Sequence, residues 1–376
     1  MISAPVWEDG AWQSLPALDG EVTADVCVIG LGGSGLACVR ELLATGRRVV
    51  GIDAAGIGGG AGGRNGGFLL AGLPSFYHDA AQRFGQERVR AVYRRTVNEI
   101  DRMTAETPAA IRRVGSLRIA DDATELADCE AQLAMMRADG LPAEAYDGPE
   151  GRGILIPTDG AYNPLLRCRL LAQHALAEGA RLFERSAALE IRGDRVTTER
   201  GSVQCTRAIV AVDGTLDTLL PELGSRVRSA RLQMIATDPV LTIDLPRPVY
   251  QRYGYEYWQQ LPDRRIALGG LRDRAGEGEW TDRAEVSDEL QRGLERILRD
   301  QLQVTAAITH RWAGIVGYSA TGLPIIDEVR RNVWAIGGYC GTGNVLGALC
   351  GRGVAHLAVE GKSDLLKELY SPSSRA

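Results

Sequence analysis

A glycine-rich stretch in residues 25–67 constrains the fold of this chain more than any other part. A short apolar run, residues 26–29, leads into Gly30-x-Gly32-x-x-Gly35, and a helical pattern follows. A second β-like run then ends at the acidic Asp53. This order of strand, glycine turn, helix and second strand ending at an acidic residue is typical of the βαβ unit that binds an adenine dinucleotide. The alternative is an ordinary glycine turn, and the three flanking features argue against it.

The three glycines, the helix N-terminus and the acidic residue of such a unit each have a physical role. Gly30 permits the tight turn, Gly32 lets backbone approach a diphosphate, and Gly35 lets helix and strand pack closely. The helix N-terminus presents free N–H groups and a positive dipole end to an anion. Asp53, at the tip of the second strand, can accept a hydrogen bond from a ribose hydroxyl. We therefore predict a dinucleotide at this turn.

Composition excludes several other classes of protein. With 376 residues, the chain is long enough for two domains or for one large domain with an insertion. Its formal net charge of -5 leaves no basic excess for nucleic acid. No apolar run approaches the roughly 18 residues of a membrane span, and residues 1–20 lack the pattern of a secretion signal. The cysteines and histidines lack metal-ligand spacing, so we expect no metal site. We expect a cytoplasmic protein with a small-molecule substrate.

Two further glycine-rich segments are candidates for the same site. Residues 61–67 read Ala-Gly-Gly-Arg-Asn-Gly-Gly, and residues 333–345 combine a β-like run, a glycine turn and the start of a helix. Glycines at this density let backbone N–H groups approach phosphate or ring oxygens. The alternative for the first segment is a flexible surface loop, but the apolar residues 68–71 that follow argue against it.

The order of patterns along the chain predicts a mixed α/β fold. Alternating α/β segments are interrupted twice, which indicates a Rossmann-type nucleotide domain built from three discontinuous segments and an α+β second domain with an antiparallel sheet. We expect the nucleotide domain at 22–77, 147–225 and 308–376, and the substrate domain at 78–146 and 226–307. The predicted helices are 86–104, 123–138, 164–177, 283–302 and 346–359, and the clearest predicted strands are 115–120, 232–237, 249–259 and 265–270.

Aromatic residues mark one of these predicted strands. Tyr253, Tyr255 and Tyr257 alternate along the run 249–259 and would share one face, with Trp258 on the other. An aromatic face is more often core or sheet surface than part of a substrate pocket, and the pattern alone leaves both open.

Taken together, these motifs resemble the FAD-dependent D-amino-acid oxidase superfamily, which includes glycine, sarcosine and gamma-glutamylputrescine oxidases. The segments that carry the resemblance are 25–35, 63–67, Arg311-Trp-x-Gly314 and 338–343, in family order across nearly the whole chain. The Arg-Asn-Gly-Gly element and Tyr339 look most like the gamma-glutamylputrescine oxidase branch.

The resemblance implies FAD as cofactor and oxidation of an amine. In this family a substrate amine passes a hydride to flavin N5, the imine hydrolyses, and oxygen or another acceptor reoxidises the flavin. Residues 314–319 contain no cysteine where sarcosine oxidase tethers its flavin, so we expect non-covalent FAD. The expected FAD contacts are Gly30, Gly32, Gly33, Ser34, Gly35, Asp53, Ala54, Ala61, Gly62, Arg64, Asn65, Gly66, Gly67, Phe68, Ala188, Ala211, Gly214, Gly314, Gly338, Gly341, Thr342, Gly343, Asn344 and Val345.

The chain also departs from the family pattern. Val316 stands where glycine oxidases carry the arginine that clamps a substrate carboxylate, and Val345 stands where sarcosine oxidase has a lysine. The only lysines are Lys362 and Lys367. A simple amino-acid substrate bound in the usual way is therefore disfavoured, unless Arg272, Arg252 or Arg64 holds the carboxylate. Arg272 is also the candidate for a positive charge that assists reaction with oxygen.

Three functions remain open at this point. The first is oxidation of an amine, for example an N-substituted or gamma-glutamyl-polyamine-like one, in an aromatic pocket lined by Tyr255, Trp258 and Tyr339 beside Arg272. The second is oxidation of an amino acid with a relocated carboxylate anchor. The third is a flavin-binding subunit of a larger complex. We expect His78 and His310 to be packed residues rather than bases.

Overall fold

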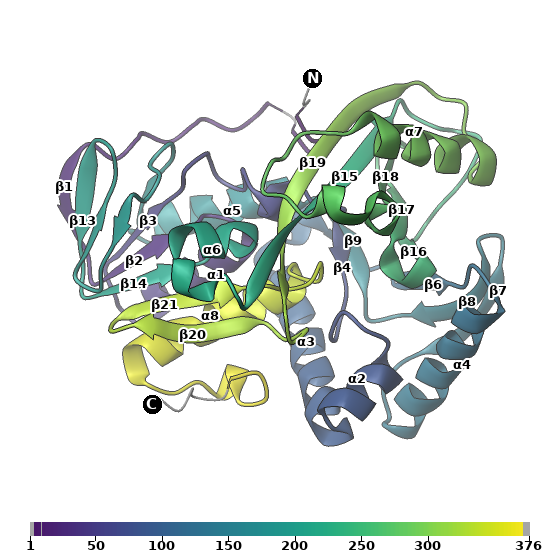
Figure 1. The fold of residues 1–376 in the computed structure, drawn as a ribbon, viewed down its shortest axis with the longest axis horizontal. Coiled ribbons are helices and arrows are strands. Elements are labelled where there is room, and N and C mark those ends of the chain that lie inside the picture. Colours follow the sequence, from purple (N-terminus) through teal and green to yellow (C-terminus); the bar gives the residue numbers. More distant parts are fainter. Residues whose placement is uncertain (1–3, 9, 371–376) are drawn as a thin grey trace.

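The computed structural model describes residues 4–8 and 10–370, and it contains two large sheets that lie side by side (Figure 1). A six-stranded sheet carries the N-terminal glycine turn, and an eight-stranded sheet carries the tyrosine-rich segment. This arrangement confirms the predicted mixed α/β fold. None of the helices in the described part of the chain combines the length and apolar character that a membrane span requires.

The six-stranded sheet is parallel except for its last strand. Its order is β10 (Arg181–Phe183), β3 (Val49–Ile52), β2 (Val26–Ile29), β14 (Arg207–Val210), β21 (Val333–Gly337) and β20 (Ile325–Arg330), with β20 antiparallel to β21. Val26 and Val28 face one hydrophobic cluster, whereas Cys27 and Ile29 face another. A sheet buried on both faces needs such continuously apolar strands, and residues 26–29 supply one.

Different layers cover the two faces of this sheet. One face packs against three long helices, and the other against a small four-stranded sheet and a short helix. The helices are α1 (Gly33–Ala44), α5 (Pro164–Ala177) and α8 (Val345–Glu360). The opposite layer is β1 (Gly20–Thr23), β13 (Gly201–Gln204), β12 (Arg195–Thr197), β11 (Glu190–Ile191) and α6 (Leu216–Leu219).

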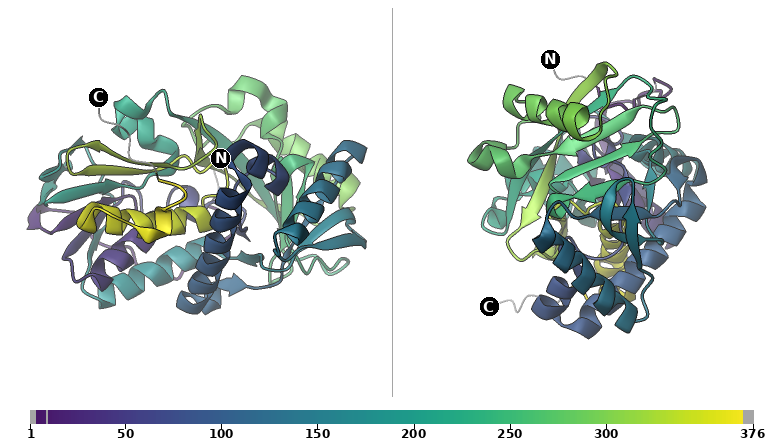
Figure 2. Two further views of the ribbon diagram at one scale, coloured as in Figure 1. Left: turned by 90° about the horizontal axis from the view of Figure 1, so that it is seen from below. Right: turned by 90° about the vertical axis from the view of Figure 1, so that its right-hand side faces the viewer.

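Helices α1 and α8 pack closely because glycine lies at their contact. A Cβ atom on Gly351 would lie 2.1 Å from the backbone oxygen of Ser34, which no side chain could tolerate. Figure 2 shows α8 beside the long helix α3 (Gln86–Glu106). Between them, the fully buried Arg352 bonds to Glu99 and Glu106 at 2.9 and 2.6 Å, so the charges of this interface are paired.

The eight-stranded sheet has one face in the core and one face toward a cavity. Helix α7 (Asp288–Arg296) covers the core face. The strand order is β19 (Ile308–Ser319), β15 (Val227–Thr237), β18 (Ile266–Gly270), β17 (Glu256–Gln260), β16 (Val249–Gln251), β6 (Ser116–Ile119), β8 (Gly151–Ile156) and β7 (Glu144–Gly148). The remaining elements are α2 (Tyr77–Phe84), α4 (Ala123–Ala138) and a three-stranded sheet of β4 (Phe68–Leu69), β9 (Gly160–Tyr162) and β5 (Ile111–Arg112).

Most of the predicted helices are confirmed, and α4, α5 and α8 match almost to the residue. Asn163 caps α5, since its side chain accepts a hydrogen bond from the Leu166 N–H. The predicted start of the helix at 283 was wrong, because α7 begins only at Asp288. Ser287 is held outside the helix by two hydrogen bonds to the buried Gln233.

The predicted single strand 249–259 was also wrong, because it is a hairpin of β16 and β17. Arg252, Tyr253 and Gly254 turn the chain with φ of 50°, 55° and 84°. The Glu125 carboxylate on α4 accepts the Arg252 and Tyr253 N–H groups at 3.1 and 2.6 Å. A contact from a helix distant in sequence therefore stabilises this turn, which the local sequence alone does not predict.

The domain boundaries stay a prediction. Two of them fall at strands of the eight-stranded sheet. The limit at 147 falls within β7, and the limit at 308 coincides with the start of β19. Both β8 and β19 belong to segments predicted for the nucleotide domain, yet they pair in the sheet of the predicted substrate domain.

Candidate functional site

Two cavities meet between the sheets. The nucleotide cavity, about 370 Å³, lies at the carboxyl ends of β2 and β3, and the aromatic cavity, about 360 Å³, lies against the eight-stranded sheet. The two share five lining residues: Ala61, Asn65, Val316, Gly341 and Asn344. A long ligand could therefore extend from one cavity into the other.

The nucleotide cavity is built around the N-terminus of α1. Gly32 caps this helix without a side-chain hydrogen bond, and the first N–H groups of a helix have no partner within it. The loop 61–67 approaches the same turn so closely that a Cβ on Gly62 would lie 2.9 Å from the Gly32 Cα. All three predicted glycine-rich segments thus line this cavity, and the first two meet at the anion-binding N-terminus of α1.

Asp53 lies at the end of β3 and lines the nucleotide cavity. Its carboxylate accepts hydrogen bonds from the Leu31 and Ala55 N–H groups at 2.7 and 2.8 Å. Burial raises the pKa of Asp53, while these two backbone bonds oppose that shift. The two bonds hold the carboxylate in place, and its remaining lone pairs can accept from hydroxyl groups.

Arg167, on α5, is a buried cation beside the α1 N-terminus. Its side chain is almost fully buried, yet the Nε and Nη2 atoms have no hydrogen-bond partner among the described residues. Its ion pair with Glu106 is long, at 4.0 Å, and a Cβ on Gly33 would lie 3.7 Å from Nη1. A buried guanidinium costs free energy unless an anion satisfies it, so this position fits a diphosphate.

Replacement of Arg167 by Met is expected to weaken dinucleotide binding by about 10- to 100-fold. Hydrogen bonds to charged groups contribute about 1.5–3 kcal/mol, and 1.4 kcal/mol corresponds to a tenfold change in Kd. Titration of the apoprotein with FAD, followed by flavin fluorescence, measures the change. Arg169→Met is the matched control, because Arg169 lies on the same helix and pairs with Glu8 outside this cavity. Equal affinity of both variants would contradict the role of Arg167.

Several strands of the eight-stranded sheet line the aromatic cavity. Tyr250 on β16 and Tyr257 on β17 are cross-strand partners, and both face the cavity. Along β19, Gly314, Val316 and Tyr318 line it at every second position, as a strand requires. Burial raises the pKa of Tyr250 to about 12 and also raises that of Tyr257, so both phenols stay neutral near pH 7.

Arg272 lies in the wall of the aromatic cavity and stacks on three rings. The centre of its guanidinium lies 4.5, 4.9 and 5.5 Å from the ring centres of Tyr318, Trp280 and Tyr255. Among the described residues, no carboxylate forms an ion pair with it. The rings fix the position of the guanidinium. The Tyr318 hydroxyl can accept from it, and its other N–H groups are available to an anion from outside the protein.

The other two arginines that the sequence suggested as anchors differ from Arg272. Arg64 lines the cavity, and its Nε donates to the Ala313 carbonyl at 2.7 Å. Burial lowers the pKa of Arg64. Arg252 is paired with Glu256 and Asp273 at 2.7 and 2.6 Å and lies outside the cavity lining, so its proposed role as an anchor was wrong.

Most of the residues expected to contact the cofactor line one of the two cavities. The nucleotide cavity contains Gly30, Gly32, Gly33, Ser34, Asp53, Ala54, Ala61, Gly62, Asn65, Ala188, Ala211, Gly341, Gly343 and Asn344. Arg64, Gly66, Phe68, Gly314 and Thr342 line the aromatic cavity, together with Tyr255 and Arg272.

The structure places a few predicted site residues elsewhere. Five of them line neither cavity: Gly35, Gly67, Gly214, Gly338 and Val345. Most of them allow close packing instead: a Cβ on Gly67 would lie 2.4 Å from the Tyr162 carbonyl oxygen, and one on Gly214 would lie 2.6 Å from that of Ile315.

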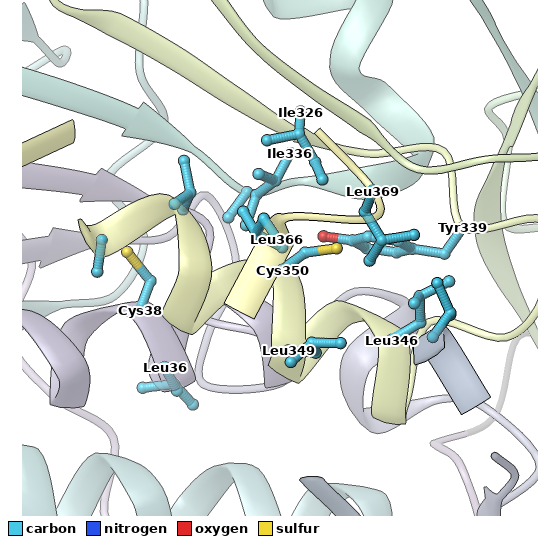
Figure 3. Packing of buried hydrophobic residues seen from close by; sticks show 14 of the residues in the cluster. Leu36, Cys38, Ile326, Ile336, Tyr339, Leu346, Leu349, Cys350, Leu366 and Leu369 are labelled. Atoms are coloured by element: carbon cyan, nitrogen blue, oxygen red, sulfur yellow. The ribbon is translucent and has the colours of Figure 1, made fainter. Parts of the chain in front are cut away.

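The aromatic pocket predicted from Tyr255, Trp258 and Tyr339 was wrong for two of the three. Trp258 alternates with Tyr257 on β17 and therefore points into the core beneath α7. Tyr339 is buried and lines the nucleotide cavity rather than the aromatic one. Figure 3 shows its ring among Leu346, Cys350 and Leu369 above α8.

Sequence reasoning missed several lining residues. Tyr250 and Tyr318 line the aromatic cavity, and Arg167 and Asp213 line the nucleotide cavity. Side chains at every second position of a strand face the same side, so the predicted site residue Gly314 could have identified Tyr318, four residues further along the same strand. The half-buried Asp213 accepts hydrogen bonds from the Gly317, Gly338 and Tyr339 N–H groups, and no spacing rule connects it to them.

Comparison with known proteins agrees with this geometry. The family model described as FAD dependent oxidoreductase (DAO) matches residues 25–357. The chain is 29% identical to "Probable oxidoreductase OrdL" of Rhizobium meliloti (strain 1021), over 95% of this chain and 89% of that protein. It is 26% identical to gamma-glutamylputrescine oxidoreductase of Escherichia coli (strain K12), over 90% of this chain and 84% of that protein. The crystal structure of L-proline dehydrogenase from P. horikoshii superposes with a TM-score of 0.75 at 20% identity, covering 93% of this chain and 96% of that one.

Proposed function

The chain belongs to the FAD dependent oxidoreductase (DAO) family, and we propose that it oxidises the C–N bond of an amine substrate that also carries a carboxylate group. The observation that carries this proposal is Arg272, a cation stacked on three rings in the wall of the aromatic cavity without a carboxylate partner among the described residues.

The residues of the nucleotide cavity fit FAD. The N-terminus of α1 and Arg167 would hold the diphosphate, and Asp53 would accept from the ribose. The flavin end would extend past Asn65 and Gly341, which belong to both cavities. When bound there, FAD supplies a two-electron acceptor for the hydride that leaves the carbon next to the substrate nitrogen.

The protein's own contribution is to position the amine and keep it neutral. Tyr250, Tyr257 and Phe68 form an apolar wall, which disfavours a charged ammonium by desolvation. Arg272 and Arg64 add positive charge to the same cavity and disfavour the ammonium further. The imine product then hydrolyses in water to a carbonyl compound.

Arg272 supports a carboxylate in particular. The planar guanidinium offers parallel N–H donors that match the two oxygens of a carboxylate. Two substrate classes meet this requirement: an amino acid, whose carboxylate is next to the amine, and a gamma-glutamyl amine, whose carboxylate is at the far end. The E. coli relative, named for gamma-glutamylputrescine, favours the second class, and the volume of about 360 Å³ accommodates either.

An anaerobic absorbance experiment tests the proposal. The purified protein is mixed with a panel of simple amines, amino acids, N-substituted amino acids and gamma-glutamyl amines, and bleaching of the flavin band is followed. We expect bleaching by carboxylate-bearing amines and little by amines of equal length that lack a carboxylate. Bleaching by plain amines alone would overturn the carboxylate requirement, and no bleaching by any amine would overturn the proposed reaction.

A further inference from the structure

A small polar recess opens behind the aromatic cavity. It has a volume of about 40 Å³ and shares Leu70, Pro74, Tyr250 and Thr342 with that cavity. Its far wall carries polar groups from several elements: Tyr93 on α3, Ser116 and Arg118 on β6, Gln132 on α4, and Asp159 in the turn between β8 and β9. The recess is a polar extension of the substrate space.

Asp159 is the acid of this recess, and it is 3% exposed. One carboxylate oxygen accepts from the Ala71 N–H at 3.0 Å and the other from the Ser116 hydroxyl at 2.7 Å. Burial raises the pKa of Asp159 to about 7, although these two bonds and the charges of Arg118 and Arg113 oppose the shift. The carboxyl group therefore changes its charge near neutral pH.

The recess also offers a polar atom that the protein leaves unsatisfied. The buried Tyr93 hydroxyl, which lines the recess, has no hydrogen-bond partner among the described residues. Arg118 stacks on Phe76, at 4.2 Å, and on Tyr250, at 5.6 Å. A volume of this size with several polar partners is suited to one or more ordered water molecules.

The aromatic cavity itself lacks a group that could take a proton from an ammonium. Its lining, as far as the structure describes the chain, contains no Asp, Glu or His. An amine arrives at neutral pH mostly as the ammonium ion and must lose a proton before a hydride can leave the neighbouring carbon. Of the aromatic cavity and the recess, only the recess has a carboxylate in its described lining, that of Asp159.

The hydrogen bonds of Asp159 suit a group that gains and loses a proton. The Ser116 hydroxyl donates to the carboxylate, and by rotation it can accept from the carboxylic acid, so the contact survives protonation. Asp213, in the nucleotide cavity, differs because its oxygens accept three backbone N–H groups, which can only donate.

On the basis of the proposed function, we propose that Asp159 accepts, through water in the recess, the proton that the substrate ammonium loses before its C–N bond is oxidised. In this step the N–H bond breaks, its electron pair stays on nitrogen as the lone pair, and an O–H bond forms on the carboxylate. No electrons leave the substrate at this stage. The acid then returns the proton to water before the next cycle.

The test is the pH dependence of anaerobic flavin reduction in the FAD-loaded full chain, with the best amine from the panel. The wild type is expected to show a rise in the second-order rate constant with an apparent pKa near 7. In Asp159→Asn this rise disappears, and the rate at pH 7 falls by about 100-fold. The remaining rate then increases with pH in proportion to the free base in solution. Asp147→Asn, at an exposed position on β7, is the control and keeps the wild-type profile.

A second variant separates a proton-transfer role from a structural one. Ser116→Ala removes a hydrogen bond that favours the carboxylate, so the rise is expected to move to higher pH. The charged and titratable groups that face Asp159 are Arg113, Arg118, Tyr93 and Tyr250, and both variants retain all of them. An unshifted rise in both variants would overturn the proposal. If Asp159→Asn fails to retain FAD, the profile of Ser116→Ala decides. Absence of reduction in the wild type would instead overturn the proposed function itself.

Discussion

Arg272→Met is expected to lower kcat/KM for the best carboxylate-bearing amine by about 30-fold or more. Loss of one partner of a buried, hydrogen-bonded charge pair costs about 2–5 kcal/mol, and 1.4 kcal/mol corresponds to a factor of ten. Methionine keeps much of the side chain's length and its contact with the rings of Tyr255, Trp280 and Tyr318, so the loss is chiefly that of the charge and its donors. Anaerobic stopped-flow reduction, at several substrate concentrations, separates binding from the chemical step.

The matched control for this variant is Arg228→Met. Arg228 also stacks on Trp280, at 4.4 Å, but its partner is Glu277 and it lies outside the cavity lining. Loss of stacking on Trp280 affects both variants, whereas loss of a cavity charge affects only Arg272→Met. A similar decrease in both variants, or no decrease in either, would contradict the anchor role.

Gly35→Ala is expected to abolish FAD binding, or nearly so. The added Cβ would lie 1.8 Å from the Gly30 carbonyl oxygen, well inside contact distance, and 3.5 Å from the Ala211 Cβ. Alanine favours helix by about 1 kcal/mol over glycine, but this gain cannot offset an overlap with the backbone of the turn that faces the diphosphate. The ratio of flavin to protein absorbance in the purified protein measures the effect.

Gly278→Ala is the control for Gly35→Ala. No atom lies within 4 Å of the Cβ position at Gly278, so this variant is expected to bind FAD like the wild type. Full FAD content in Gly35→Ala would show that the turn can open without loss of function, and the account of the nucleotide cavity would then be incorrect.

The nucleotide half was largely predictable because its features are local in sequence. A strand, a glycine turn and a helix within residues 26–44 determine their own geometry, and Asp53 follows at the end of the next strand. The periodicity of residues 123–138 likewise predicted α4 correctly. In such segments the local pattern and the tertiary fold agree.

The aromatic cavity was less predictable because distant contacts build it. The turn at Arg252 and Tyr253 depends on Glu125, more than a hundred residues away, and it makes a hairpin of the predicted single strand. Tyr253, Tyr255 and Tyr257 nevertheless line the same cavity, as their alternation suggested. The same strand geometry puts Trp258 in the core. Arg167 and Asp159 could not be recognised at all, since their significance lies in burial and in unsatisfied neighbours rather than in spacing.

The most direct test of the central claim compares one substrate with its carboxamide. The two molecules differ only in the charge and the oxygen pair that Arg272 is proposed to bind, so the amine chemistry is unchanged. We predict that the second-order rate constant of flavin reduction in the wild type is at least 30-fold higher with the carboxylate substrate than with its carboxamide. Arg272→Met is expected to remove this preference. Equal rates for both molecules in the wild type would contradict the claim that the aromatic cavity recognises a carboxylate.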